Sequence, residues 1–110
     1  MDECDLLAQM KLLHDSYAEK LPGKLAEIEC MWETMANVAW GGAAFEELLR
    51  ALHSLAGSGK TFGFPGVSEA ARAAELALAG FGAANTAPGA EQRSRIQGLI
   101  LGLRDSVNRV

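Results

Sequence analysis

The chain has 110 residues, of which 49% are hydrophobic and 22% charged, a balance that suits one soluble globular domain over residues 1–110. Its formal net charge of −4 argues against a general nucleic-acid binder, because contact with a phosphate backbone needs a positive surface. The sequence contains no run of about 18 apolar residues, so no membrane span is predicted. The acidic start MDECDLLAQ lacks the layout of a signal peptide, and we therefore expect a cytoplasmic protein.

Apolar residues recur at helical spacing along the chain, and the alternating pattern of strands is absent. The stripe of the first predicted helix is formed by Leu6, Met10, Leu13 and Tyr17. Pro22 suits the first turn of a second helix, because proline is tolerated where the backbone N–H has no partner. The stripe of that helix is formed by Leu25, Ile28, Trp32, Met35 and Ala39. The segment Trp40-Gly41-Gly42 is expected to end it.

A third helix is predicted from about Ala44 to about Phe64, ended by Pro65-Gly66, because proline disfavours a helical residue before it. A fourth stripe, poor in bulk, is formed by Val67, Ala70, Ala71, Ala74 and Leu78. Residues 80–89 are interpreted as a flexible connection, and the last helix is expected from about Ala90 to about Asn108. These elements predict an all-α fold, an antiparallel four-helix bundle with an additional N-terminal helix. No dimer seam is evident, which favours a monomer.

The segment SLAGSGKT, residues 54–61, partly matches the P-loop that binds nucleotide phosphates. That motif requires glycine where this chain has Ser54, and it lies between a strand and a helix. The residues before the segment repeat as a helix, and no later apolar strand ends in an aspartate. We therefore interpret the segment as part of the third helix.

At about 100° per residue, one side of this third helix is apolar and faces the core. His53 points the opposite way, into solvent. Gly57, one turn later, costs about 1 kcal/mol relative to alanine in a helix interior, and its missing side chain opens space beside the imidazole. The outer side around His53 is formed by Glu46, Leu49, Arg50, Ala56, Gly57, Lys60 and Phe64. The other histidine, His14, is interpreted as an ordinary surface residue, and no histidine or cysteine spacing indicates a metal site.

The run HSLAGSGKTFGF, residues 53–64, resembles the signature of histidine-containing phosphotransfer domains. In that signature the histidine is followed by an aliphatic residue, a glycine, small residues, and a large apolar residue before another glycine. The resemblance implies that His53 accepts a phosphoryl group and passes it to or from the aspartate of a response-regulator receiver domain. It also implies a sensor histidine kinase as a partner, no cofactor on this chain, Mg²⁺ on the receiver, and no kinase or ATPase activity.

The chain departs from that signature at Ala56, where the family often has a lysine three places after the histidine. Lys60 and Arg50 lie one turn beyond Ala56 and one turn before His53, and either could offset the phosphate charge. Gly57 is expected beside the phosphate. The residues expected to contact the partner are Glu46, Leu49, Ala56 and Phe64. The missing lysine leaves open a second hypothesis, a non-phosphorylated helical module that docks a receiver or kinase domain.

Overall fold

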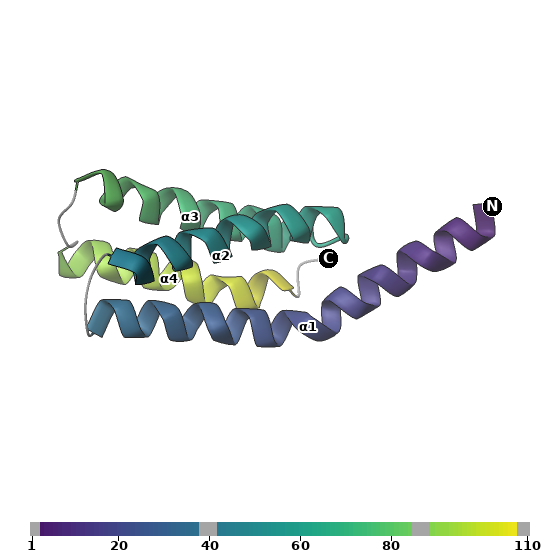
Figure 1. Cartoon of the computed structure of the whole chain (residues 1–110), viewed down its shortest axis with the longest axis horizontal. Coiled ribbons are helices and arrows are strands. Elements are labelled where there is room, and N and C mark those ends of the chain that lie inside the picture. The colour runs from purple at the N-terminus through teal and green to yellow at the C-terminus, as the bar shows by residue number, and fades with distance from the viewer. Residues whose placement is uncertain (1–2, 38–41, 85–88, 108–110) are drawn as a thin grey trace.

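The computed structural model describes residues 3–37, 42–84 and 89–107, and in these ranges it contains four helices and no strand. The helices are α1 (Glu3–Asn37), α2 (Gly42–Thr61), α3 (Pro65–Ala84) and α4 (Ala90–Val107). They pack side by side into an elongated bundle, and the N-terminal part of α1 extends beyond the other three (Figure 1). None of these helices combines the length and apolar character needed to cross a lipid bilayer.

Helix α1 runs through Pro22, so the prediction of two helices divided at this residue is wrong. The additional N-terminal helix expected from the sequence is the first part of α1. A proline inside a helix removes one backbone hydrogen bond and bends the axis. Leu21 and Leu25, on either side of Pro22, are both buried in the core, and this packing holds α1 helical through the proline. Figure 1 shows α1 bending away from the bundle toward its N-terminus. Residues 3–13 of this part are all exposed.

The turn between α2 and α3 occupies residues 62–64, so α2 ends at Thr61 and not at about Phe64 as predicted. Gly63 has a φ of 90°, a backbone conformation that favours glycine. The amide of Phe64 donates to the carbonyl of Gly59 at 2.7 Å and so satisfies a carbonyl at the end of α2. Pro65 starts α3, where its missing N–H costs nothing.

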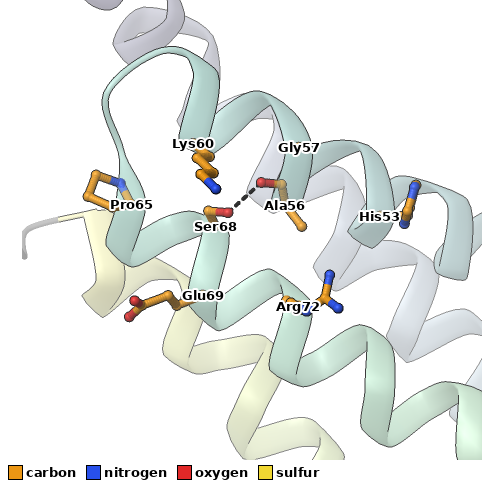
Figure 2. A pocket seen from close by; sticks show the side chains of 8 residues that line it. All are labelled: His53, Ala56, Gly57, Lys60, Pro65, Ser68, Glu69 and Arg72. Atoms are coloured by element: carbon orange, nitrogen blue, oxygen red, sulfur yellow. Dashed lines mark hydrogen bonds between the residues drawn. The ribbon is translucent and has the colours of Figure 1, made fainter.

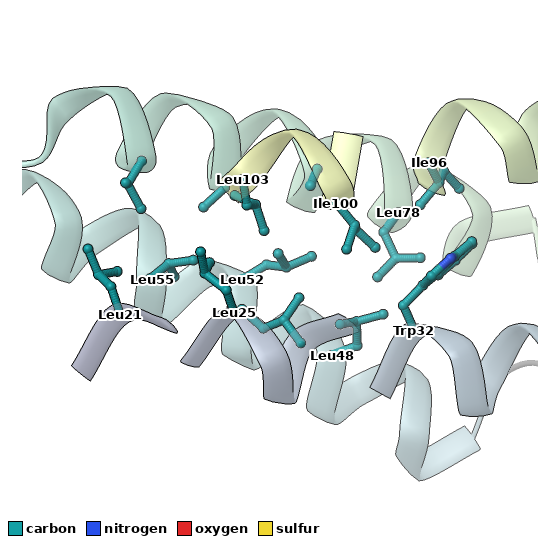
Figure 3. Close-up of a cluster of buried hydrophobic side chains, with 14 of the residues drawn as sticks. Leu21, Leu25, Trp32, Leu48, Leu52, Leu55, Leu78, Ile96, Ile100 and Leu103 are labelled. Carbon is teal, nitrogen blue, oxygen red and sulfur yellow. The ribbon is translucent and has the colours of Figure 1, made fainter. Parts of the chain in front are cut away.

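The core lies along the bundle axis and receives side chains from all four helices (Figure 3). The fully buried large side chains are Leu21, Met35, Leu48, Leu52, Val67, Leu78, Ile96, Ile100 and Leu103. Helix α3 contributes mainly small residues, with Ala71 and Ala74 completely buried, as its stripe predicted. At Gly59 an added Cβ would lie 3.2 Å from the backbone nitrogen of Ser68, so α2 and α3 approach closely here.

Two arginines of α4 bind α1. The guanidinium of Arg104 donates to both carboxylate oxygens of Glu29, at 2.6 and 3.1 Å, and Arg93 donates to the carbonyl of Ala36. The pKa of Arg104 is raised by its hydrogen bond to Glu29 and by the charge of that carboxylate. These contacts fix α4 against the C-terminal part of α1.

The connection predicted over residues 80–89 is shorter than expected, because α3 continues to Ala84. The remainder of that connection, residues 85–88, lies outside the described residues. The predicted end of the second helix at Ala39–Gly41 and the last helical residue, Asn108, also lie outside them.

Candidate functional site

His53 lies in the middle of α2, and its side chain has 76% of its surface exposed to solvent. The residues Leu52 and Leu55 of the same helix are buried in the core. The imidazole is therefore carried by a helix that is held on its opposite side, which agrees with the expected outward orientation.

One nitrogen of the His53 ring is occupied by a carboxylate from the neighbouring helix. Nδ1 lies 2.8 Å from Oε2 of Glu75, a residue of α3 that is half-buried. An ionised carboxylate only accepts hydrogen bonds, so Nδ1 carries the proton and donates it. In the neutral ring the lone pair is then on Nε2, the nitrogen that Glu75 does not bind.

An open groove of about 490 Å³ runs from His53 toward the turn between α2 and α3 (Figure 2). Helix α2 lines it with His53, Ala56, Gly57 and Lys60, and α3 lines it with Pro65, Ser68, Glu69 and Arg72. The hydroxyl of Ser68 donates to the carbonyl of Ala56 and holds the two helices together under the groove. The groove offers an exposed imidazole, two cations and one carboxylate to a polar ligand.

The structure brings together three of the site residues that were predicted around His53, namely Ala56, Gly57 and Lys60, in this groove. An added Cβ at Gly57 would meet no atom within 4 Å, so the space there is open. Arg50 and Glu46 are exposed and Leu49 is half-buried, and none of these three lines the groove.

The expectation that Phe64 faces outward beside His53 is wrong, because its side chain is buried with 8% of its surface exposed. Its ring stacks on His14 and lies 5.7 Å from the ring centroid of Tyr17. The projection at about 100° per residue fails here because α2 has already ended and Gly63 redirects the chain.

The interpretation of His14 as an ordinary surface histidine is also wrong. Its Nδ1 donates to the carbonyl of Phe62 at 2.9 Å, and an added Cβ at Gly63 would lie 2.8 Å from this nitrogen. His14 therefore joins α1 to the turn between α2 and α3. The sequence carried little sign of this contact, because the two segments lie 48 residues apart.

The polar residues of α3 were not predicted as part of the site. Ser68, Arg72 and Glu75 are spaced by four and three residues, which places them on one face of α3, the face toward α2. This row was present in the sequence as a polar stripe beside the small apolar one. Its relation to His53 depends on how α2 and α3 pair, and that pairing is not visible in either helix alone.

The P-loop alternative does not agree with the structure. Residues 54–61 are helical, and the hydroxyl of Thr61 donates to the carbonyl of Gly57 at 3.0 Å within α2. A phosphate-cradling loop needs its backbone N–H groups turned toward the ligand, whereas a helix uses them internally. Across the described residues, no three histidine, cysteine or acidic side chains come together as a metal-binding group.

Comparison with known families shows which family the chain belongs to. The family model described as "Hpt domain" matches residues 5–110, which is nearly the whole chain. Neither the curated proteins nor the solved structures gave a significant match. The chain belongs to the Hpt domain family, whose members are helical phosphocarriers of two-component phosphorelay signalling and interact with response regulators and histidine kinases.

Proposed function

We propose that the chain is a phosphocarrier in which His53 accepts a phosphoryl group on Nε2 and passes it to or from the aspartate of a receiver domain. The observation that carries this proposal is the exposed imidazole whose Nδ1 is hydrogen-bonded to Glu75 at 2.8 Å. With the proton held on Nδ1, Nε2 presents a lone pair to solvent. The family match supports the proposal, because it spans the segment that contains both residues.

Transfer requires in-line attack by Nε2 on the phosphorus of an aspartyl phosphate. The N–P bond forms while the P–O bond to the aspartate breaks, and the electron pair of that bond leaves on the aspartate carboxylate. Glu75 stabilises the positive charge that develops on the ring, because its carboxylate faces Nδ1. The reverse transfer follows the same path. Phosphoryl transfer of this kind depends on positioning and charge more than on covalent help from the protein.

The receiver domain is expected to supply Mg²⁺ and the acidic residues that hold it, and this chain to act without a cofactor of its own. We propose that the chain has no independent kinase or ATPase activity. An antiparallel bundle that is a monomer in the cytoplasm fits this role. The expected partners are a receiver domain and a sensor histidine kinase, and neither nucleic acid nor a membrane is expected to take part.

The partner is expected to dock over the part of α2 that surrounds His53. Leu49 and Ala56 are half-buried and Gly57 is open, so a receiver could approach the ring without meeting a large side chain. Glu46, Arg50 and Lys60 are exposed around this area and would adjust specificity and encounter rate. Partners in a relay must separate after transfer, so a small transient interface is expected.

Incubation with ³²P-labelled receiver domains tests the proposal directly. The wild-type chain is expected to acquire label that is lost in acid and stable in base, as for a phosphohistidine. The chain has two histidines, so His53→Gln and His14→Gln form a matched pair. Only His53→Gln is expected to abolish labelling, with circular dichroism confirming that both variants fold.

Two results would overturn the proposal. Label that persists in His53→Gln would place the acceptor elsewhere. Tight binding of a phosphorylated receiver without any label on the chain would favour the non-phosphorylated docking module instead.

A further inference from the structure

We infer that Arg72 of α3 is a phosphoryl-binding residue, whose guanidinium holds the oxygens of a phosphoryl group on Nε2 of His53 in place of the lysine missing at Ala56. The inference rests on the proposed function, since it concerns the phosphorylated form of His53. The supporting observations are the packing of α2 against α3 and the charged side chains that line the groove between them.

Two hydrogen bonds define how α3 lies against α2 at this point. Ser68 donates to the carbonyl of Ala56, and Glu75 accepts from Nδ1 of His53. Arg72 comes four residues after Ser68 and three before Glu75, so it shares their face of α3. Its side chain therefore leaves α3 between the contact to Ala56 and the contact to His53. Figure 2 shows it extending from α3 toward α2.

Arg72 has its hydrogen-bonding groups available for a ligand. It is exposed, it lines the groove, and it forms no ion pair or hydrogen bond with another residue of the described ranges. The nearby carboxylate of Glu75 is already bound to His53. A guanidinium presents paired N–H donors that match two oxygens of a phosphate, which makes arginine suited to this position.

The cations of α2 are less well placed. A helix rises by about 1.5 Å per residue, so Lys60 starts about 10 Å along the axis from His53, compared with about 4.5 Å for position 56. Arg50 is about 4.5 Å away along the axis but does not line the groove. Arg72 approaches from the neighbouring helix and so provides a positive charge close to the region that a lysine at position 56 would reach.

Phosphoramidate is a suitable probe, because this small donor needs no partner protein. Nε2 of His53 attacks its phosphorus, the N–P bond of the donor breaks, and ammonia leaves with the electron pair. The full chain is compared with Arg72→Ala, Arg72→Lys and Arg95→Ala, where Arg95 is an exposed arginine of α4 outside the groove. The two measurements are the rate of phosphohistidine formation and the ³¹P shift of the product as a function of pH.

We expect Arg72→Ala to slow phosphorylation by roughly five- to tenfold, because a charge-assisted contact to the phosphoryl group is lost. Arg72→Lys should recover part of this rate, and Arg95→Ala should match the wild type. The ³¹P titration midpoint should rise in Arg72→Ala, since a nearby guanidinium favours the more negative form of the phosphoryl group. A purely structural effect of Arg72 would not move that midpoint.

The outcomes separate the two proposals. Phosphorylation of wild type and Arg72→Ala at equal rates, with equal ³¹P midpoints, overturns the role of Arg72 and leaves the phosphocarrier function intact. An equal loss in Arg95→Ala also overturns it, because it would reflect net charge. Failure of the wild type to acquire phosphate on His53 overturns the proposed function and this inference together.

Discussion

The imidazole of His14 lies flat against the ring of Phe64, with ring centroids 4.4 Å apart and an interplanar angle of 7°. The same imidazole donates from Nδ1 to the carbonyl of Phe62. One side chain of α1 thus makes a stacking contact and a hydrogen bond to the turn that joins α2 to α3. Since that turn sets the start of α3, His14 supports the helix that carries Glu75.

His14→Ala is expected to lower the free energy of unfolding by about 1–2 kcal/mol, because it removes an aromatic stack and leaves the Phe62 carbonyl without its partner. His53→Ala is the matched control and should change stability by less than about 1 kcal/mol, since its contact to Glu75 is exposed. Urea unfolding followed by circular dichroism measures both. A larger loss in the His53 variant would contradict this assignment of roles.

Gly57 and Gly59 are expected to respond in opposite ways to alanine. At Gly57 an added Cβ meets open space, so Gly57→Ala should stabilise the chain by up to about 1 kcal/mol through helix propensity. At Gly59 the Cβ would lie 3.2 Å from the nitrogen of Ser68 and 3.3 Å from the carbonyl oxygen of Phe64. These are backbone atoms, so Gly59→Ala should be the less stable variant. Thermal unfolding of the two variants side by side tests this order.

The hydroxyl of Tyr17 is hydrogen-bonded to Ser58 at 2.7 Å, and burial raises the pKa of this group above its ordinary value of 10.0, an effect that the bond to Ser58 partly opposes. Above about pH 10 the unfolded chain releases this proton while the folded chain retains it, so stability falls as pH rises through that range.

Tyr17→Phe removes the hydrogen bond to Ser58 and should therefore lower the free energy of unfolding by about 1 kcal/mol at pH 7. The difference in the free energy of unfolding between the wild type and this variant should shrink above about pH 10, because only the wild type loses stability there and phenylalanine does not titrate. Urea unfolding at pH 7 and at about pH 10.5, roughly half a unit above the ordinary tyrosine pKa, measures this difference in stability. A constant difference between the two proteins at both pH values would disagree with a raised pKa of Tyr17.

Glu75→Ala should shift the tautomer of neutral His53 away from the form protonated on Nδ1, because the acceptor for that proton is removed. Glu75→Gln is the control, since its amide oxygen can still accept the bond. Two-dimensional ¹⁵N NMR of the imidazole reports the tautomer. If the wild type and both variants share one tautomer population, Glu75 does not hold the ring.

The sequence predicted the helical class, the outward position of His53 and most of the core, because these follow from the period of the helix. In the first stripe only Tyr17 is buried, whereas Leu6, Met10 and Leu13 are exposed where α1 extends beyond the other helices. The other errors lie where the period stops. Phe64 follows the end of α2, so its direction depends on Gly63 and the turn. Pro22 was expected to start a helix, but α1 continues through it, with Leu21 and Leu25 packed into the core on either side.

Contacts between helices were the part that sequence patterns could not supply. Glu75 lies 22 residues from His53, and its pairing with the ring requires the offset of α3 against α2. That offset follows from Gly59, where the absence of a side chain lets the Ser68 backbone come close. The close contact at Gly59 therefore helps to set which residues of α3 reach His53.

The bond between His53 and Glu75 joins two separate helices, so its length depends on the interhelical spacing. The ¹⁵N NMR signals of the His53 ring therefore report on that spacing. A docked receiver that moved α3 relative to α2 would change this hydrogen bond, and the resulting shift of the His53 nitrogen signals would show that recognition and reactivity are mechanically coupled.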